Sequence, residues 1–446
     1  MAMACACAKA CRSCLPTTSA WCMVISTDDR EKTMTTTTRI FISCIACVTA
    51  AWPAAAGESP QFRGPDRSGI FNETGLLKAW PEGGPKKLWV AAGIGRGYSS
   101  VSVAGGKIYV TGMRDDETGV LSIFDLGGKL ERAIPYGKET NEKQAPGARS
   151  TPTLDGDRVY FLSGLGVLYC VDLAKGAVQW EVNVLERFGG TLPMWHISES
   201  VLIDGDRVIC TPGGKDGRLA ALNKLTGETV WTTTGFEDTA SYCSPAIFTH
   251  SGKRILTTAT AATIVGADPD TGKLLWAFAH KGPYDIHGVT PVYHDGLLYY
   301  VAGDGFGGGT LALSDDGSSV TPKWENKSLD CLHHGVVLLD GHLYGTGYRA
   351  DSALECLEFK TGNVVWTTRD VQEGNTVYAD GMLYVYEGPK TGVVSLVKAQ
   401  PTGFERTGSF TVTDGGDDKH WAHPTIANGV LYIRHGDAVI AYDVRS

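Results

Sequence analysis

Short runs of β-branched and aromatic residues, five or six residues long, recur along the chain from about residue 86 to the C-terminus. Each run is bounded by Gly, Asp or Asn, the residues that form tight turns. In the second repeat the runs lie at about 150–154, 158–163, 166–172 and 177–183. No segment keeps apolar residues at a sustained helical spacing. The pattern therefore predicts an all-β chain of short strands joined by hairpins.

A Gly followed by an apolar run that usually contains Tyr recurs eight times, at spacings of 40–50 residues. The glycines of the eight copies are Gly106, Gly156, Gly205, Gly252, Gly296, Gly341, Gly381 and Gly429. Repeats of this length, each with four short strands, are typical of β-propellers, which leave only short and protected strand edges. The eight copies predict an eight-bladed β-propeller with four antiparallel strands per blade.

A second motif, Thr-Gly-x-x-x-Trp, runs in phase with the first. It occurs at 226–231, 271–276 and 361–366, with a near match at 175–180. One large flat side chain per repeat can fill the wedge between neighbouring blades, so we expect these tryptophans to serve packing.

The last repeat has only three runs, all between residues 422 and 442. The missing strand is available upstream in Lys-Lys-Leu-Trp-Val at 86–90, where Trp89 supplies the motif tryptophan. We therefore expect strand 86–91 to complete the last blade and close a ring made of residues 86–446.

The sequence Ala-Asp-Pro-Asp-Thr-Gly-Lys-Leu-Leu-Trp at 267–276 closely resembles the tryptophan-docking motif of the PQQ-like, quinoprotein-type propellers. The resemblance extends over residues 86–446. It implies an eight-bladed propeller but leaves two kinds of function open. The superfamily includes PQQ-dependent alcohol and glucose dehydrogenases, and also the non-catalytic propeller of the outer-membrane β-barrel assembly machinery. The segment at 61–70 is similar to an arm that precedes many secreted propellers of this type.

The chain departs from the dehydrogenases of that superfamily in three respects. It has no adjacent cysteine pair, no Cys-x-x-Cys-His haem site, and no segment that matches their Glu, Asn and Asp around Ca²⁺. PQQ with Ca²⁺ is therefore expected as a cofactor only if the protein is a quinoprotein-like oxidoreductase. Downstream of residue 57 the five cysteines are odd in number and widely spaced, which does not indicate a disulfide framework. Two of them, Cys170 and Cys356, occupy equivalent places in the repeat and are expected to be small buried residues.

The first 56 residues are expected to lie outside the fold. Residues 1–33 show no periodicity and are interpreted as a non-native lead, whereas 34–56 have the charged start, apolar stretch and small-residue end of a secretory signal peptide. A lipoprotein anchor is a less favoured alternative, because no leucine stands three positions before Cys47. Residues 57–85 form an N-terminal arm ahead of the propeller. We therefore expect a periplasmic or secreted protein without a transmembrane span.

The chain has 40 Lys and Arg against 49 Asp and Glu, a formal net charge of −9. This balance argues against a nucleic-acid-binding protein, which would carry a basic patch and a high pI. Glycine is abundant, with 56 residues, which fits a protein with many tight turns.

The histidines gather just before the first strand of several repeats, where a propeller chain returns to the central axis. Six histidines share this place: His196, His287, His333, His334, His420 and His423. Arginines hold the corresponding places in the first two repeats. The hypothesis is a ligand-binding rim around the axis made of Arg96, Arg149, His196, His287, His334 and His423. The six histidines are also a candidate metal site, since converging imidazoles bind metals. The competing interpretation is that each imidazole bonds to the backbone of a neighbouring blade.

Two functions follow. The favoured one is a non-catalytic scaffold, expected to be a monomer, that binds envelope proteins or a small ligand. The alternative is a quinoprotein-like oxidoreductase that acts on alcohols or sugars. A metal-dependent enzyme is a weaker third hypothesis.

Overall fold

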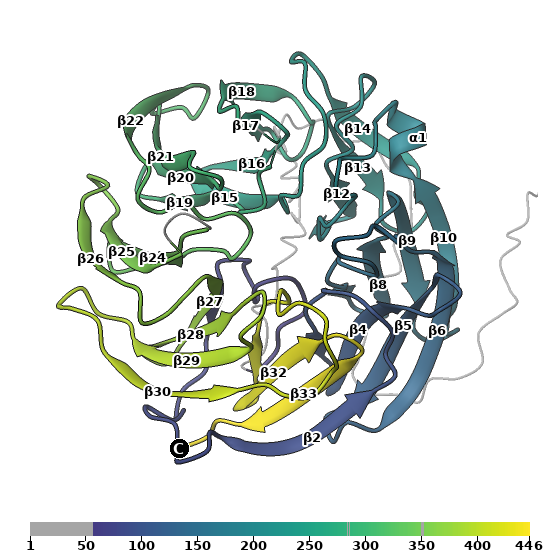
Figure 1. Ribbon diagram of the computed structural model, residues 1–446. Helices are drawn as coiled ribbons and strands as arrows, with labels where there is room; N and C mark the ends of the chain where they lie inside the picture. Colours follow the sequence, from purple (N-terminus) through teal and green to yellow (C-terminus); the bar gives the residue numbers. More distant parts are fainter. Residues whose placement is uncertain (1–56, 283, 285, 349–351) are drawn as a thin grey trace, which may run out of the picture. The chain divides into compact units, whose positions relative to one another are not determined.

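The computed structural model describes residues 57–446, except 283, 285 and 349–351. The regular secondary structure of the described chain is almost entirely strand, with one short helix, α1 (Val184–Phe188), after the second blade. Eight sheets of four antiparallel strands stand around a central axis (Figure 1). The predicted all-β eight-bladed propeller is confirmed. The lead at 1–33 and the signal peptide at 34–56 lie outside the described residues, and no described helix is long and apolar enough to cross a membrane.

The blades follow one another in sequence, each running from the axis outward. Blade 1 comprises β3 (Ser102–Ala104), β4 (Lys107–Met113), β5 (Thr118–Asp125) and β6 (Leu130–Lys138), and blade 2 comprises β7 (Thr153–Asp155), β8 (Arg158–Leu162), β9 (Val167–Asp172) and β10 (Ala177–Asn183). Blade 3 comprises β11 (Leu202–Asp204), β12 (Arg207–Cys210), β13 (Leu219–Asn223) and β14 (Thr229–Thr233). Blade 4 comprises β15 (Ala246–His250), β16 (Lys253–Ala259), β17 (Thr263–Ala267) and β18 (Leu274–Ala279).

The second half of the ring repeats this order. Blade 5 comprises β19 (Val292–His294), β20 (Leu297–Ala302), β21 (Gly307–Leu313) and β22 (Val320–Asn326). Blade 6 comprises β23 (Val337–Leu339), β24 (His342–Thr346), β25 (Leu354–Glu358) and β26 (Val364–Thr368). Blade 7 comprises β27 (Gly374–Ala379), β28 (Met382–Glu387), β29 (Val393–Lys398) and β30 (Arg406–Thr411). Blade 8 has only three strands from the C-terminal end: β31 (Thr425–Ala427), β32 (Val430–His435) and β33 (Ala438–Asp443).

The fourth strand of blade 8 comes from the N-terminal side of the chain. Strand β2 (Lys86–Ala92) pairs antiparallel with β33, from Lys86 opposite Asp443 to Ala92 opposite Ala438. The predicted closure of the ring is confirmed, because the first and last parts of the propeller share one sheet.

Tryptophans on the outermost strands of blades 2, 3, 5, 6 and 8 join each of these blades to the next. The Trp231 indole N–H donates to the Pro269 carbonyl of the next blade at 3.1 Å. The ring also covers Gly272, whose φ is +72° and where a Cβ would come within 2.5 Å of the indole. Only glycine fits this turn beneath the ring. The same pairing joins Trp89 to Gly128, Trp180 to Gly227 and Trp324 to Gly362.

Trp276 is an exception to this pattern. Its indole N–H is buried and has no partner among the described residues. The next blade has the turn Ser314–Ser319 in place of a Thr-Gly turn, and Gly317 in this turn faces Ile255 instead of the indole.

The difference between Trp231 and Trp276 gives a test of the hydrogen bond from the indole N–H to the next blade. Replacing Trp231 by phenylalanine should lower the free energy of unfolding by about 1–3 kcal/mol more than replacing Trp276, because only the first change leaves a buried carbonyl without its donor. Both changes remove a similar volume. Urea denaturation followed by circular dichroism would measure the difference, and equal losses would contradict a stabilising role for the bond.

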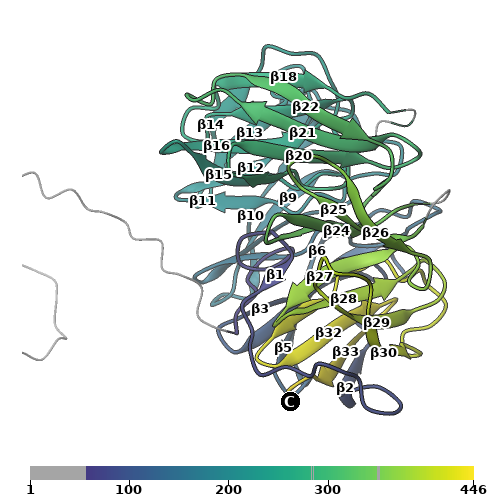
Figure 2. The same cartoon turned by 90° about the vertical axis from the view of Figure 1, so that its left-hand side faces the viewer.

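The N-terminal arm (57–85) lies against the end of the ring where the first and second strands of each blade are joined. Ser59 exchanges backbone hydrogen bonds with Val103 of blade 1, and the Pro60 carbonyl accepts from Leu154 of blade 2. Further on, β1 (Ile70–Phe71) adds to β27 of blade 7 as a parallel strand. Figure 2 shows β1 on the left-hand side of the ring. The arm therefore crosses from the first blades to the last ones.

Two arginines of the arm are buried between the blades. Arg63 is 6% exposed and donates to the carbonyls of Val336 at 2.7 Å and Thr376 at 3.1 Å. On the other side of the axis, Arg67 is 3% exposed and donates to the carbonyls of Ser200 at 2.7 Å and Pro245 at 3.1 Å. The arm thus braces blades 6 and 7 and blades 3 and 4 from the inside.

The cores lie between adjacent blades, and the cysteines belong to them. Cys170 and Cys356 are fully buried, as predicted, and both are free thiols. The five cysteines of the described residues are all unpaired and buried.

Candidate functional site

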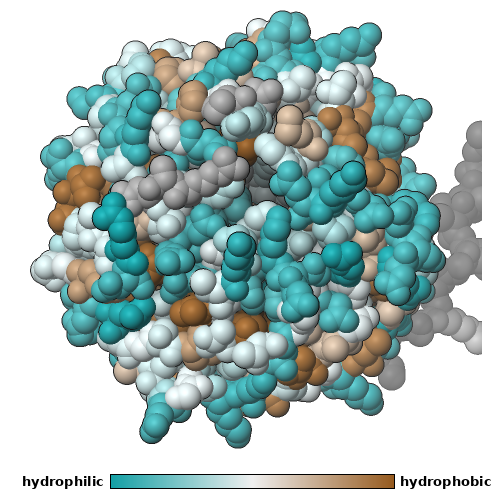
Figure 3. All heavy atoms as spheres, in the orientation of Figure 1, coloured by the Kyte–Doolittle hydropathy of each residue, from teal (hydrophilic) through white to brown (hydrophobic). Residues whose placement is uncertain are grey.

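A pocket of about 360 Å³ lies on the axis, at the end of the ring opposite the arm. Its walls come mainly from the connections that lead into the innermost strands, because each chain crossing from rim to axis ends at this face. The lining residues are Phe62, Tyr98, Gln144, Ala145, Arg149, Thr151, Trp195, Ser198, Tyr242, Ser244, Tyr284, Ile286, Gly288, Asp304, Leu332, His333, Tyr348, Trp421 and His423. Figure 3 shows a mostly hydrophilic surface with scattered hydrophobic patches in the orientation of Figure 1.

Aromatic rings from different blades form much of the wall. On one side Trp195 lies beside Tyr242, with ring centroids 6.1 Å apart. On another side Tyr98 lies beside Trp421, with centroids 5.7 Å apart. Phe62 of the arm contacts His423 edge-on, with centroids 4.9 Å apart, and closes the inner end of the pocket.

Arg149 is the central cation of the pocket, but its donors are already used. Its guanidinium donates to the carbonyls of Ala145 and Trp195 and forms an ion pair with Glu142 at 3.4 Å. Burial lowers the pKa of Arg149, although the carboxylate of Glu142 opposes this effect. Arg149 therefore holds two connections together and has little capacity left for an anionic ligand.

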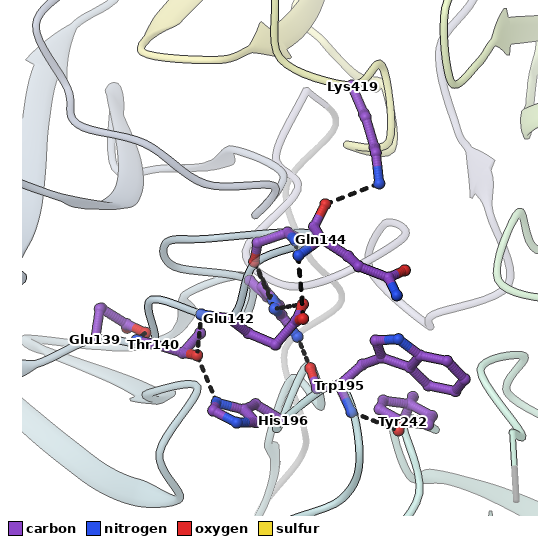
Figure 4. A network of polar contacts seen from close by, with 10 residues as sticks. Glu139, Thr140, Glu142, Gln144, Trp195, His196, Tyr242 and Lys419 are labelled. Atoms are coloured by element: carbon purple, nitrogen blue, oxygen red, sulfur yellow. Dashed lines mark hydrogen bonds and ion pairs between the residues drawn. The ribbon is translucent and has the colours of Figure 1, made fainter. Parts of the chain in front are cut away.

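Lys419 ties the connection before blade 8 to the one before blade 2. Its ammonium donates to the Gln144 carbonyl at 2.8 Å and lies 4.0 Å from the centre of the Trp421 ring. Burial lowers the pKa of Lys419. Figure 4 shows the side-chain amide of Gln144 turned to the same side as the Trp195 indole. This amide has no hydrogen-bond partner among the described residues.

Two of the predicted histidines line the pocket. Arg63 can only donate, so the Nδ1 of His423, 3.1 Å away, accepts, and its Nε2 carries the proton and donates to the His333 carbonyl at 3.0 Å. Burial and the nearby Arg63 keep the pKa of His423 well below its usual value. Burial lowers the pKa of His333 to about 4. Both imidazoles are therefore neutral at pH 7.

His334 packs behind the pocket wall. Its ring lies 4.2 Å from that of His333 and it is 1% exposed. Burial keeps its pKa well below the usual value. Neither ring nitrogen of His334, nor Nε2 of His333, has a partner among the described residues.

The remaining predicted residues point elsewhere. The Nδ1 of His196 bonds to the Thr140 hydroxyl, as Figure 4 shows, and Nδ1 of His287 lies 3.2 Å from the Ala261 carbonyl. His420 bonds through Nδ1 to the Tyr386 hydroxyl at 2.6 Å. Arg96 forms an exposed ion pair with Asp418 at 3.0 Å. These four side chains do not line the pocket, so the structure places only Arg149, His333 and His423 of the predicted residues on its wall.

The residues do not fit a metal or PQQ with Ca²⁺. Among the described residues no three His, Cys, Asp or Glu side chains are grouped as metal ligands. PQQ carries three carboxylates, whereas Arg149, the cation on the pocket wall, is paired with Glu142 and bonded to backbone carbonyls, and His333 and His423 are neutral.

Sequence reasoning missed the aromatic wall, although a signal was present. Trp195 and Trp421 stand next to His196 and His420 in the same connections, out of phase with the Thr-Gly-x-x-x-Trp motif. A tryptophan outside the repeat period cannot dock two blades, and this could have marked both as pocket residues.

Comparison with solved structures supports the fold. BamB from Moraxella catarrhalis aligns with a TM-score of 0.58 at 16% identity, over 80% of this chain and 99% of that one. Quinohemoprotein alcohol dehydrogenase from Comamonas testosteroni aligns with a TM-score of 0.63 at 14% identity, over 89% of this chain and 82% of that one. The computationally designed protein Ika8 aligns with a TM-score of 0.55 at 13% identity, over 80% of this chain and all of the other.

At these identities the likenesses show the fold alone, and they include an enzyme, an assembly factor and a designed protein. A sequence comparison with curated proteins finds no relative. The profile of one family, described as outer membrane protein assembly factor BamB, matches residues 117–368, which is more than half of the chain. The chain therefore belongs to this BamB family of PQQ-like β-propellers.

Proposed function

We propose that the protein is a non-catalytic binding propeller of the cell envelope, exported by its signal peptide and acting as a monomer. The axial pocket and the face around it receive a small ligand or another envelope protein. The family membership supports the envelope location. The observation that carries the proposal is the state of the basic groups on the pocket wall, since Arg149 is paired with Glu142 and the imidazoles of His333 and His423 are neutral.

This arrangement suits binding better than redox or acid–base chemistry. A general acid or base works best when its pKa lies near the operating pH, whereas burial lowers that of His333 to about 4. His423 is held on both sides by Arg63 and the His333 carbonyl. The aromatic wall, in contrast, offers apolar surface to a bound molecule, as in most ligand pockets.

The competing function is a PQQ-dependent oxidoreductase, which the fold likeness to quinohemoprotein alcohol dehydrogenase favours. Titration of the purified protein with PQQ and Ca²⁺, followed by quinone absorbance and tryptophan fluorescence, should give no saturable binding at high micromolar quinone. The reason is that Arg149, the cation on the pocket wall, is already paired with Glu142 and bonded to backbone carbonyls, so it cannot balance the three carboxylates of PQQ. Tight one-to-one binding would refute the proposal and justify a screen of alcohols and sugars with a dye acceptor.

A further inference from the structure

We propose that the axial pocket binds a neutral saccharide, held between its aromatic walls; this rests on the proposed function, in which that pocket is a ligand site. The pocket combines aromatic faces with neutral hydrogen-bonding groups. Its volume of about 360 Å³ lies at the small end of the range of ~300–1,000 Å³ found for small-molecule sites.

The aromatic residues supply stacking surfaces on two sides. The pair Trp195 and Tyr242 comes from the connections before blades 3 and 4, and the pair Tyr98 and Trp421 from those before blades 1 and 8. Rings held by separate blades form a rigid wall, so a ligand need not immobilise them on binding. A sugar ring presents C–H groups on its faces and hydroxyls at its edge, which matches a wall that is apolar with polar groups between the rings.

Groups without a partner in the protein show where a ligand would bond. The Nε2 atom of His333 is buried and has no partner among the described residues, although the residue lines the pocket. Leaving such an atom unpaired is costly, and a ligand hydroxyl could donate to it or accept from it. The amide of Gln144 and the hydroxyl of Ser198 likewise have no partner in the part of the chain that the structure describes, and both line the same pocket. A wholly apolar ligand would cover these groups without satisfying them.

The charges around the pocket select a neutral ligand. Arg149 is paired with Glu142, and the Lys419 ammonium is bonded to a carbonyl and covered by the Trp421 ring. Several other polar groups on the wall, among them the Gln144 amide, the Ser198 hydroxyl and the neutral imidazoles of His333 and His423, carry no charge. Since the arginine of the wall is already paired with Glu142, the hydroxyls of a neutral ligand match these groups better than a charged group does.

The test uses the purified protein on an array of neutral and acidic glycans, and then calorimetric titration with the best neutral glycan and with cellobiose, maltose and N,N′-diacetylchitobiose. Neutral glycans should bind in preference to uronic-acid and sulfated ones. Trp421→Ala and Gln144→Ala should each weaken binding about tenfold or more. Gln179→Ala, an exposed change on the outer strand β10, is the matched control and should leave binding unchanged.

Three outcomes would overturn the assignment: no neutral glycan binds, acidic glycans bind more tightly, or Gln144→Ala behaves like its control. Circular dichroism of each variant separates lost binding from lost folding. The proposed function fails separately, through saturable binding of PQQ with Ca²⁺. Without saccharide binding and without quinone binding, the proposed binding propeller stands while the saccharide assignment falls.

Discussion

Replacing Arg63 by alanine is expected to lower the free energy of unfolding by about 3–5 kcal/mol, because it leaves two buried carbonyls without donors. The guanidinium donates to Val336 of blade 6 and Thr376 of blade 7 and bonds to His423 before blade 8. Burial lowers the pKa of Arg63 to about 10, so the group stays charged at pH 7. A buried charge of this kind is tolerated only when its hydrogen bonds are satisfied.

Urea denaturation of Arg63→Ala beside Arg114→Ala would measure this effect. Arg114 is an exposed residue in the turn between β4 and β5, so its replacement removes a similar side chain without breaking contacts between blades. The stability of Arg63→Lys should lie between those of Arg63→Ala and Arg114→Ala, since one ammonium group cannot replace a planar guanidinium that donates to several acceptors. If Arg63→Ala and Arg114→Ala unfold at the same urea concentration, the arm does not brace the ring.

The sequence predicts the fold well because the propeller repeats one local design. The blades share an order of four short strands and similar turns, and most of them carry a tryptophan at one place, so eight imperfect copies strengthen one another. The exception at Trp276 follows from the next blade, where the turn at Ser314–Ser319 replaces Thr-Gly and leaves the indole N–H without an acceptor. Departures of this kind do not hide the repeat.

The site is only partly predictable, because position along the chain does not fix where a side chain points. The connections before the first strands do reach the axis, and they bring His333, His423 and Arg149 to the pocket. His196 occupies an equivalent place but has a φ of +62° and bonds to Thr140. His287 packs instead against His280, with Nδ1 of His280 3.0 Å from its Nε2. The repeat sets the backbone, whereas local contacts decide the direction of each imidazole.

The role of the arm could not be derived from periodicity. Arg63 contacts residues 273 and 313 positions further along the chain, and no local pattern encodes such distances. The spacing of Arg63 and Arg67 in Gln-Phe-Arg-Gly-Pro-Asp-Arg-Ser-Gly becomes meaningful only once blades on opposite sides of the axis are placed. Phe62, within the predicted arm 57–85, likewise becomes a pocket residue only through the fold.

Removal of strand β2 is expected to have the largest effect on the protein. A chain that starts at Gly93 lacks the six residue pairs between β2 and β33 and the docking tryptophan Trp89, whose indole N–H donates to the Leu126 carbonyl at 3.0 Å. At roughly 0.5–1.5 kcal/mol for each hydrogen bond, and with the lost packing of Trp89, the loss is about 5 kcal/mol or more. This is comparable to the whole stability of many domains, roughly 5–15 kcal/mol. The ring then has an open blade, and we expect cooperative thermal unfolding to be lost.

Chains that start at different residues separate the contribution of strand β2 to stability from that of the arm. A chain that starts at Lys86 keeps β2 but lacks the arm, so it should still unfold cooperatively, at a lower temperature than a chain that starts at Gly57. The decisive variant starts at Gly93 and carries residues 86–92 after Ser446 through a short turn. Because Lys86 lies opposite Asp443 in an antiparallel pair, the moved strand can fold back onto β33 as a hairpin. Calorimetry should show its cooperative transition restored close to that of the chain starting at Lys86. If the moved strand restores nothing, or if the chain starting at Gly93 melts like the one starting at Lys86, the ring does not depend on this strand for closure.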